Sequence, residues 1–239
     1  AGTNWIWSGD FPDFQEIYPL SAIGVRVMFA FLQCWSLEIW QSDGTPSGTT
    51  QVAVLPVSTG GWFWGFYPAG GRGVFFANDG AHGLEPWVTD GTSAGTHLLR
   101  DVRPGPEGSL DTYFSTDFAV LGDLLLMKLD DGVHGRELWR TDGTAAGTAL
   151  VADLEPVEVS ASIGSLLGAV GGVELFTLGG SGGGLQLWRT DGTAAGTTPL
   201  THFGGPLSPS YPESLTDAGT LLYFDAQQDA SGVWPWRTD

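Results

Sequence analysis

Two short stretches of the sequence place a histidine between carboxylates at matching positions. The pattern Asp-Gly-x-His-Gly-x-Glu occurs at Asp79–Glu85 and again at Asp131–Glu137. Carboxylate oxygens are ligands that Ca²⁺ prefers, so these turns are candidate calcium sites. The candidate metal ligands are Asp79, Glu85, Asp131 and Glu137. The spacing is not that of an EF-hand loop, and the alternative is a hairpin in which the histidine bonds a nearby carboxylate.

Aromatic side chains form the second group of candidates. They recur in segments rich in Gly, Ser and Pro that separate groups of short apolar runs, and two of them alternate in a glycine-flanked stretch. An aromatic ring there can stack on a sugar or on an apolar ligand, whereas the alternative is that it covers the end of a core. The candidate ligand-binding residues are Tyr18, Trp62, Trp64, Tyr113, Phe114 and Tyr211.

Familiar signatures of enzymes are missing from the sequence. It contains no H-E-x-x-H, S-x-x-K or C-x-x-C pattern, and G-x-S-x-G occurs only within glycine-rich turn segments, at Gly91–Gly95 and Gly179–Gly183. The one cysteine, Cys34, excludes an intrachain disulfide. Paired carboxylates of the glycosidase type have no recognisable spacing, and 27 acidic residues supply many candidates. The motifs therefore favour binding over catalysis without excluding an enzyme.

The elements that must position these residues are repeated along the chain. The decapeptide WRTDGTAAGT occurs twice without change, at Trp139–Thr148 and Trp188–Thr197. Related copies begin at Trp40 and Trp87, the sequence ends in WRTD, and it begins with AGT. The motif aspartates are Asp43, Asp90, Asp142, Asp191 and Asp239, at intervals of 47, 52, 49 and 48 residues. The sequence therefore consists of five similar units.

Each unit has the pattern of β-structure. Short aliphatic runs alternate with Gly-Asp and Asp-Gly turn signals, as expected of a four-stranded antiparallel meander. Repeats of this length with four strands each are typical of β-propeller blades. We expect an all-β, five-bladed propeller in a single domain, with its ring closed by a strand from the N-terminus that pairs with the C-terminal blade. The expected blades are 16–56, 61–103, 113–154, 160–203 and 211–239 completed by 1–10.

The repeated decapeptide itself is expected to build the scaffold. Asp-Gly supplies the turn, the aspartate carboxylate accepts backbone N–H bonds within it, and the preceding tryptophan fills space between blades. Ligand binding is expected instead on the variable loops, with the turn between second and third strands and the crossing between blades on the same face.

These residues resemble a bacterial repeat family written ELWxTDGTxAGT, sometimes described as hyalin-repeat-like. The stretches DGAHGLEPWVTDGTSAGT and DGVHGRELWRTDGTAAGT carry the resemblance most clearly. The other units depart from it, because the first lacks the glycine turn and the fourth replaces it with GGSGGG. The resemblance implies secretion or display on a bacterial cell surface, and it implies no particular activity.

Charge narrows the classes of partner. The net charge is −18, with 9 Lys and Arg against 27 Asp and Glu, so nucleic acid and anionic membranes are repelled. No apolar stretch reaches the length of a membrane-spanning helix, so membrane insertion is not expected. We predict a secreted, non-catalytic, lectin-like module that binds a glycan or another small sugar-like or apolar ligand. The alternatives are a glycosidase-like hydrolase with one site near Trp35, Trp62 and Trp64, and an adhesion or spacer module.

Overall fold

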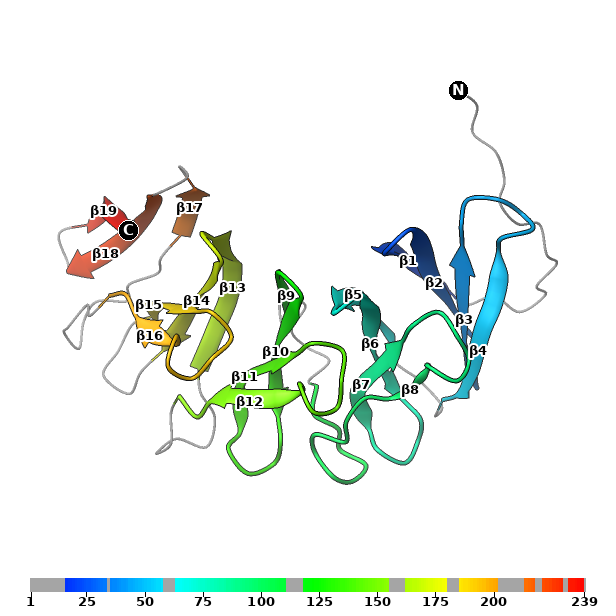
Figure 1. The fold of residues 1–239 in the computed structure, drawn as a ribbon. Coiled ribbons are helices and arrows are strands. Elements are labelled where there is room, and N and C mark those ends of the chain that lie inside the picture. Colours follow the sequence, from blue (N-terminus) through cyan, green and yellow to red (C-terminus); the bar gives the residue numbers. More distant parts are fainter. Residues whose placement is uncertain are drawn as a thin grey trace. The chain divides into compact units, whose positions relative to one another are not determined.

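The computed structural model consists of antiparallel β-sheets (Figure 1). It describes residues 16–33, 35–57, 63–110, 118–154, 162–179, 185–201, 213–217, 221–229 and 232–238. Among these residues there is no helix with the length and apolar character needed to cross a bilayer. They fall into two compact units. The first unit contains β1–β8 and the segment Thr141–Thr148. The second unit contains β9–β19 apart from that segment.

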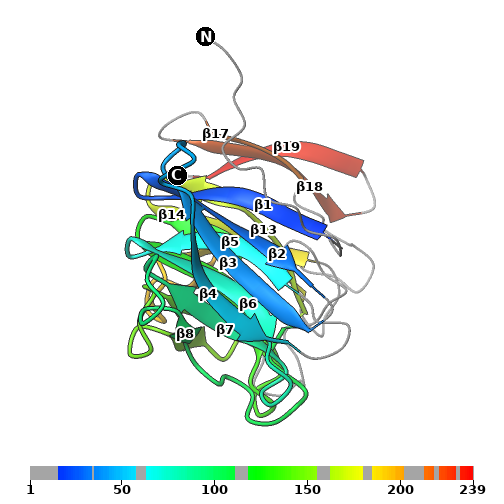
Figure 2. The same ribbon diagram turned by 90° about the vertical axis from the view of Figure 1, so that its right-hand side faces the viewer.

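The first unit contains two four-stranded sheets. The first sheet has the order β1-β2-β3-β4 and faces the viewer in Figure 2. Its strands are β1 Glu16–Ile23, β2 Arg26–Leu32, β3 Ser36–Ser42 and β4 Thr50–Pro56. The second sheet has the order β5-β6-β7-β8. Its strands are β5 Phe63–Ala69, β6 Arg72–Asn78, β7 Leu84–Thr89 and β8 His97–Leu98. All the paired neighbours are antiparallel and consecutive in sequence, as a meander requires.

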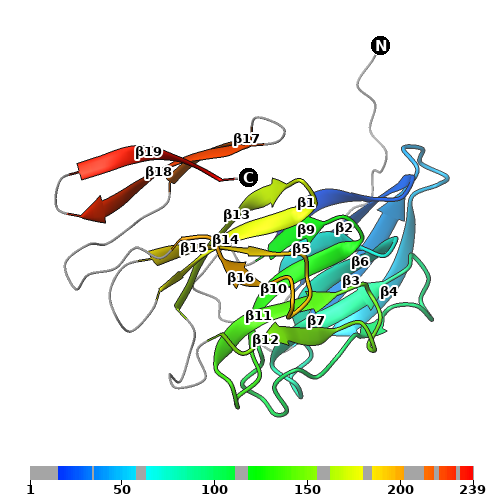
Figure 3. The ribbon, with the colours of Figure 1, turned by 60° about the vertical axis from the view of Figure 1, so that its left-hand side comes forward.

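The remaining strands form three more sheets. The third sheet contains β9 Phe118–Leu121, β10 Leu124–Asp130, β11 Arg136–Thr141 and β12 Ala149–Ala152. The fourth contains β13 Ser162–Val170, β14 Val173–Gly179, β15 Leu185–Thr190 and β16 Thr198–Pro199. The fifth has three described strands, β17 Glu213–Asp217, β18 Leu222–Asp229 and β19 Gly232–Thr238, drawn in orange to red in Figure 3. The expected fourth strand of that sheet, in residues 1–10, lies outside the described residues.

Most side chains of the inner strands β6, β10 and β14 are buried, and within each unit neighbouring sheets share a hydrophobic core. In the first unit, Met28 and Leu37 of the first sheet join Phe75 and Trp87 of the second in one core. In the second unit, one core joins the third and fourth sheets, and another joins the fourth and fifth. Each buried aromatic or aliphatic side chain contributes roughly 1.5–3 kcal/mol relative to exposure, so these cores hold neighbouring sheets together.

The motif tryptophans belong to this packing. Three of them lie against the phenylalanine that they face on the neighbouring strand, with ring centroids 6.2–6.4 Å apart. The pairs are Phe29–Trp40, Phe75–Trp87 and Phe176–Trp188. Trp87 and Trp188 also pack into cores that include the preceding sheet. The structure thus gives these indoles the space-filling role expected of them.

A second repeated feature is an irregularity in the first strand of the sheets. The strand register shifts by one residue in β1, β5, β13 and β17. In β13 the first of two such shifts lies between Ile163 and Leu166, where neighbouring side chains make hydrogen bonds to the backbone. The Lys128 ammonium donates to the Gly164 carbonyl at 2.8 Å, and the Ser165 N–H donates to Thr177 Oγ1 at 3.1 Å. Lys128 is only 4% exposed, so this contact joins the third and fourth sheets within their core.

Candidate functional site

The aspartate of each repeated decapeptide is engaged within its own turn. In the second sheet, Asp90 Oδ1 accepts hydrogen bonds from the Thr92 N–H at 2.9 Å and the Thr92 hydroxyl at 2.7 Å. The Thr92 hydroxyl oxygen in turn accepts the Gly95 N–H at 3.0 Å. The same three bonds occur around Asp43, Asp142 and Asp191. The hydroxyl and N–H of Thr92 lower the pKa of Asp90 below its ordinary value.

Close packing explains the glycine at the end of this turn. A β-carbon at Gly95 would overlap the Asp90 carboxylate, and the corresponding glycine is in the same position in the other three copies. Below the turn, the Thr89 and Thr96 hydroxyls share a buried hydrogen bond of 2.7 Å. Hydrogen bonding and close packing therefore account for the repeated sequence of these turns, as expected if the decapeptide builds the scaffold.

The two turns with a histidine are also internally bonded. Asp79 Oδ1 accepts the N–H groups of Ala81 and His82, both at 2.9 Å, and Asp79 Oδ2 lies 2.8 Å from His82 Nδ1. Asp131 makes the same contacts with Val133 and His134. The carboxylate raises the pKa of each histidine. Burial raises the pKa of Asp79, but the hydrogen bonds from His82 and Ala81 outweigh it and the net shift is downward.

The Glu85 side chain bonds the crossing that follows the second sheet, and not the turn that precedes Glu85. Its side chain is 0% exposed. Glu85 Oε2 accepts the Val102 N–H at 3.1 Å and the Ser109 hydroxyl at 2.7 Å, and Oε1 accepts the Arg103 N–H at 3.0 Å. Burial raises the pKa of Glu85 to about 7, although these three donors oppose the shift. One carboxylate thus fixes both ends of the crossing that follows the second sheet.

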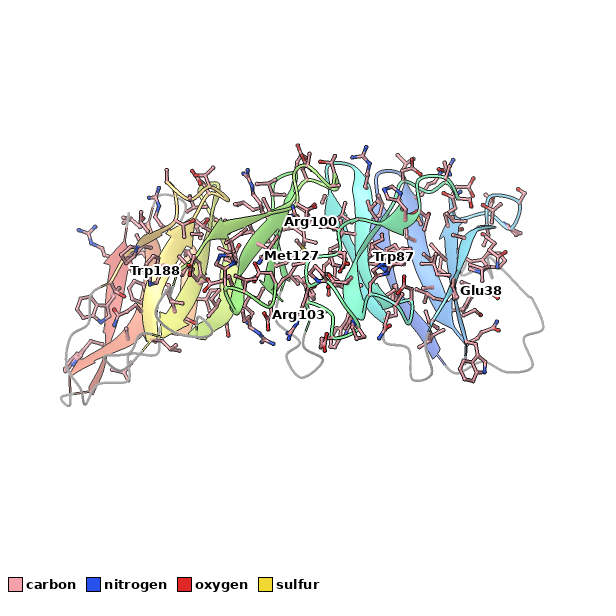
Figure 4. All side chains as sticks on the ribbon, turned by 90° about the horizontal axis from the view of Figure 1, so that it is seen from below. Glu38, Trp87, Arg100, Arg103, Met127 and Trp188 are labelled. Carbon is pink, nitrogen blue, oxygen red and sulfur yellow. The ribbon has the colours of Figure 1, made fainter. Side chains whose placement is uncertain are left out.

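Backbone contacts bring that crossing against the start of β7. The N–H groups of Ser109 and Leu110 both donate to the Leu84 carbonyl, at 3.1 and 3.3 Å. Gly83, with φ of +69°, leaves no room for a β-carbon beside Gly108. We call this the loop end of the sheet, formed by the turn 79–83 and the crossing 101–110. The turn Asp90–Gly95 lies at the other end of β7, here named the turn end. Arg103 of the crossing and Trp87 of β7 are labelled in Figure 4.

This geometry does not fit a calcium site. Both Asp79 oxygens and both Glu85 oxygens accept hydrogen bonds from the protein's own N–H and O–H groups. Asp131 repeats the arrangement of Asp79, and Glu137 Oε2 accepts the Leu154 N–H at 3.2 Å. Within the described ranges, no three His, Cys, Asp or Glu side chains are grouped as a metal ion would need. The alternative interpretation, a hairpin with a local histidine–carboxylate bond, describes the two turns.

The aromatic candidates are only partly described. Tyr18 lies within β1, where it faces Ala30, and Trp64 lies within β5, where it faces Phe76. Both are therefore strand residues, whereas the sequence placed them in crossings, because strand pairing extends further into these aromatic segments than the turn signals suggested. Trp64 is half-buried, and its buried indole N–H has no hydrogen-bond partner in the described part. Trp62, Tyr113, Phe114 and Tyr211 lie outside the described residues.

The sequence interpretation missed a repeated polar position two residues before the motif tryptophan. It is occupied by Glu38, Glu85, Glu137 and Gln186 in the first four sheets, and by Trp234 in the fifth. Glu137 bonds the backbone 17 residues later, as Glu85 does, and Gln186 Oε1 accepts the Thr201 hydroxyl at 3.1 Å. The pattern Glu-x-Trp was visible in three units, but its partners are distant in sequence.

In the first sheet the same position supports side chains instead of the crossing. Glu38 Oε1 accepts the Gln33 amide N–H at 3.0 Å. Glu38 Oε2 accepts the Trp40 indole N–H at 3.1 Å and the Gln51 amide N–H at 3.0 Å. Glu38 is labelled on the first sheet in Figure 4. The loop end of this sheet therefore presents amide groups around a carboxylate, beside an exposed Trp35 in the turn between β2 and β3.

Comparisons with known proteins bear on the fold. No protein-family model and no curated protein matches the chain. A solved prolyl endopeptidase aligns with 87% of this chain and 30% of its own, at 17% identity and a TM-score of 0.52. A solved puromycin hydrolase mutant aligns with 89% of this chain and 33% of its own, at 13% identity and a TM-score of 0.51.

The chain thus spans about a third of the length of these solved chains. At this level of identity the similarity concerns architecture alone. Together with the consecutive antiparallel sheets, it identifies a β-propeller-like, all-β repeat fold.

Proposed function

We propose that this chain is a non-catalytic, secreted or surface-displayed binding module that recognises carbohydrate through the loop ends of its sheets. The observation that carries the proposal is the locking of the crossing 101–110 onto β7 by Glu85 and by the Leu84 carbonyl. A rigid loop end lowers the entropy lost on binding. The scaffold turns repeat almost letter for letter, whereas the segments that join successive units differ in sequence and include Trp62, Tyr113 and Tyr211.

We further propose that the chain forms a closed ring of five blades, with residues 1–10 completing the fifth sheet. Support comes from side chains at matching positions. Met28 and Leu37 are buried against the second sheet, at 2% and 0% exposure. Their counterparts on the fifth sheet, Tyr223 and Val233, are 43% and 63% exposed. Closure of the ring covers this face of the fifth sheet, and an added strand makes backbone hydrogen bonds along the outer edge of β19.

Hydrogen exchange tests the ring. In the full chain the outward-facing amides of β19 are expected to be protected, and deletion of residues 1–10 removes that protection while amides of β2 stay protected. Protection of β19 that survives the deletion contradicts the closure. Protection that is lost on dilution shows instead that the strand comes from a second copy.

Glycan-array binding is the experiment for the function, with calcium and then with a chelator. Binding to a coherent set of glycans supports the proposal, and insensitivity to chelator agrees with the finding that no metal-binding group of side chains occurs among the described residues. Alanine variants of Trp64, Tyr113 and Tyr211 are expected to weaken binding. Val25→Ala is the matched control, because Val25 is 97% exposed in the β1–β2 turn at the turn end.

The other outcomes identify the alternative functions. Turnover of a glycan by a single site sensitive to Trp64→Ala indicates the glycosidase-like enzyme. A blank array combined with normal folding contradicts carbohydrate binding and favours the adhesion or spacer module. The similarity to a prolyl endopeptidase and a puromycin hydrolase does not extend to their activity, because it concerns the fold and covers about a third of each chain.

A further inference from the structure

The turn between β2 and β3 differs from its counterparts in the second and third sheets. Those sheets use the longer, internally bonded turns that begin at Asp79 and Asp131. In the first sheet the Gln33 N–H donates to the Ser36 carbonyl at 2.8 Å, which closes a shorter turn that contains Trp35. The Val57 N–H donates to the Trp35 carbonyl at 3.1 Å, so a second hydrogen bond holds the Trp35 backbone.

The Trp35 side chain is exposed although its backbone is fixed. It is 65% exposed, whereas the motif residues Trp87 and Trp139 are 9% and 4% exposed. An indole left in water forgoes the free energy of burial that the motif tryptophans gain, and its turn requires no aromatic residue. A large ring on a hydrogen-bonded turn is pre-organised, because a ligand that stacks on it does not have to order the backbone first.

Polar groups suited to hydroxyl ligands adjoin this turn. Gln33, at the first position of the turn, donates one amide N–H to Glu38. In the described part of the chain that is the only side-chain hydrogen bond of Gln33, so its amide oxygen and its second N–H remain for a ligand. The Glu38 carboxylate orients Gln33 from one side and Gln51 from the other. The Gln33 amide is therefore held in a defined orientation, two residues before Trp35 in the same turn.

A pyranose ring matches this combination of groups. One face of the sugar presents C–H groups that stack on an aromatic ring, and its edge presents hydroxyls that pair with a planar amide. The net charge of −18 and the Glu38 carboxylate repel uronic and sialic acids. Resting on the proposed carbohydrate-binding function, we infer that Trp35 and Gln33 form a binding subsite for neutral pyranoses at the loop end of the first sheet, with Glu38 as a positioning residue.

The test measures binding of neutral disaccharides by the full chain and its variants. The probes are lactose, cellobiose, maltose and N,N′-diacetylchitobiose. Each is titrated into the protein, and Kd is obtained from the changes in NMR chemical shifts. Trp35→Ala is expected to weaken the best of these ligands about ten-fold, and Gln33→Ala about five-fold. Trp35→Phe, which keeps a stacking face, is expected to stay within about three-fold of the original affinity.

Trp234→Ala is the matched control for the loss of an exposed indole. Trp234 is 54% exposed on β19, and its position in the repeat is that of Glu38, not that of Trp35. Its variant is expected to leave the affinity unchanged. Unfolding midpoints of all variants are compared first, and an exposed Trp35 predicts that Trp35→Ala folds normally.

Each remaining outcome decides the inference. If the neutral sugars bind and Trp35→Ala and Gln33→Ala leave Kd unchanged, the subsite is overturned while the carbohydrate-binding function stands. If no neutral disaccharide binds and galacturonic acid does, the inferred ligand class is overturned. If no saccharide binds the intact chain, both proposals fail. Proline-rich peptides are tested as a further probe. If Trp35→Ala weakens binding of these peptides and not of sugars, Trp35 belongs to a peptide site and the inference is overturned.

Discussion

The loop ends of the first and second sheets use the same glutamate position for different purposes. In the second sheet Glu85 is fully buried and bonds the backbone of the crossing at Val102 and Arg103. In the first sheet Glu38 is half-buried and bonds the side chains of Gln33, Trp40 and Gln51. The difference shows that a repeat can keep a residue while its partners change, and the partners decide whether it stabilises the fold or orients a surface.

The largest expected effect separates these two glutamates. Glu85→Ala leaves two N–H groups and one hydroxyl without an acceptor in a buried site, and we expect a loss of about 3–4 kcal/mol of unfolding free energy. Glu38→Ala removes bonds among partly exposed groups and is expected to lose about 1 kcal/mol. Urea unfolding measures both. Equal losses of unfolding free energy would contradict the conclusion that Glu85 stabilises the fold and Glu38 orients surface side chains.

Close packing at the turn end gives the next effect. Gly95→Ala places a methyl group on the Asp90 carboxylate and is expected to destabilise the chain by about 2 kcal/mol. In an Asp90→Ala background the same change is expected to lose less than about 1 kcal/mol, because the obstructing carboxylate is gone. A double-mutant cycle measured by denaturant unfolding gives the coupling, and additive effects would show that the overlap is not what selects glycine.

The pH dependence of stability sharpens the contrast between Glu85 and the turn aspartates. The raised pKa of Glu85, about 7, means that its contribution is fully present below the unfolded value of 4.5 and is lost as pH rises through about 7. His82 and His134 act in the same direction, since their raised pKa values favour the charged form below 6.5. The urea midpoint should therefore fall from pH 5 to pH 8, and Glu85→Gln should flatten that fall.

The turn aspartates predict the opposite trend at lower pH. The pKa of Asp90 and of Asp142 is lowered by the threonine hydroxyl two residues later. Their contribution is present above the unfolded value of 3.8 and is lost as pH falls through the lowered values. Maximum stability is expected near pH 5. A maximum above pH 7 is inconsistent with the raised pKa of Glu85.

The smallest expected effect concerns the two histidine turns. The His82 and His134 side chains are 38% and 39% exposed, and each pairs with a carboxylate in its own turn. Solvent screens exposed pairs of this kind, so His82→Ala and His134→Ala should each shift the urea midpoint only slightly at pH 6. Matching shifts are expected from the two variants, because the two turns have the same hydrogen bonds.

The sequence predicted those parts of the fold that depend on local chemistry. Asp90 and Thr92 are two residues apart, and Asp79 and His82 are three apart, so their bonds follow from the turn pattern. The four-stranded units were predicted for the same reason, because alternation and turn signals are properties of a short window. The expected boundaries of the first blade, 16–56, coincide with the ends of β1 and β4.

The functional positions of Glu85 and Trp64 were not predicted, because they depend on distant or competing interactions. Glu85 was taken as a candidate metal ligand of its turn, but its donors lie 17 to 24 residues further along the chain. Trp64 lies in a glycine-flanked stretch, which suggested a loop, but pairing with Phe76 places it in a strand. Glu38 was overlooked because it lacks the preceding Asp-Gly-x-His-Gly turn that singled out Glu85.

The buried Lys128 also makes opening of the second unit chemically observable. Lys128 is the only lysine among the 239 residues, and its ammonium is bonded to the Gly164 carbonyl of the next sheet. Its amine can meet a water-borne acylating reagent only when the third and fourth sheets separate there. The rate at which a single acyl group appears at Lys128 therefore reports how often that core opens, and Lys128→Arg provides the unreactive reference.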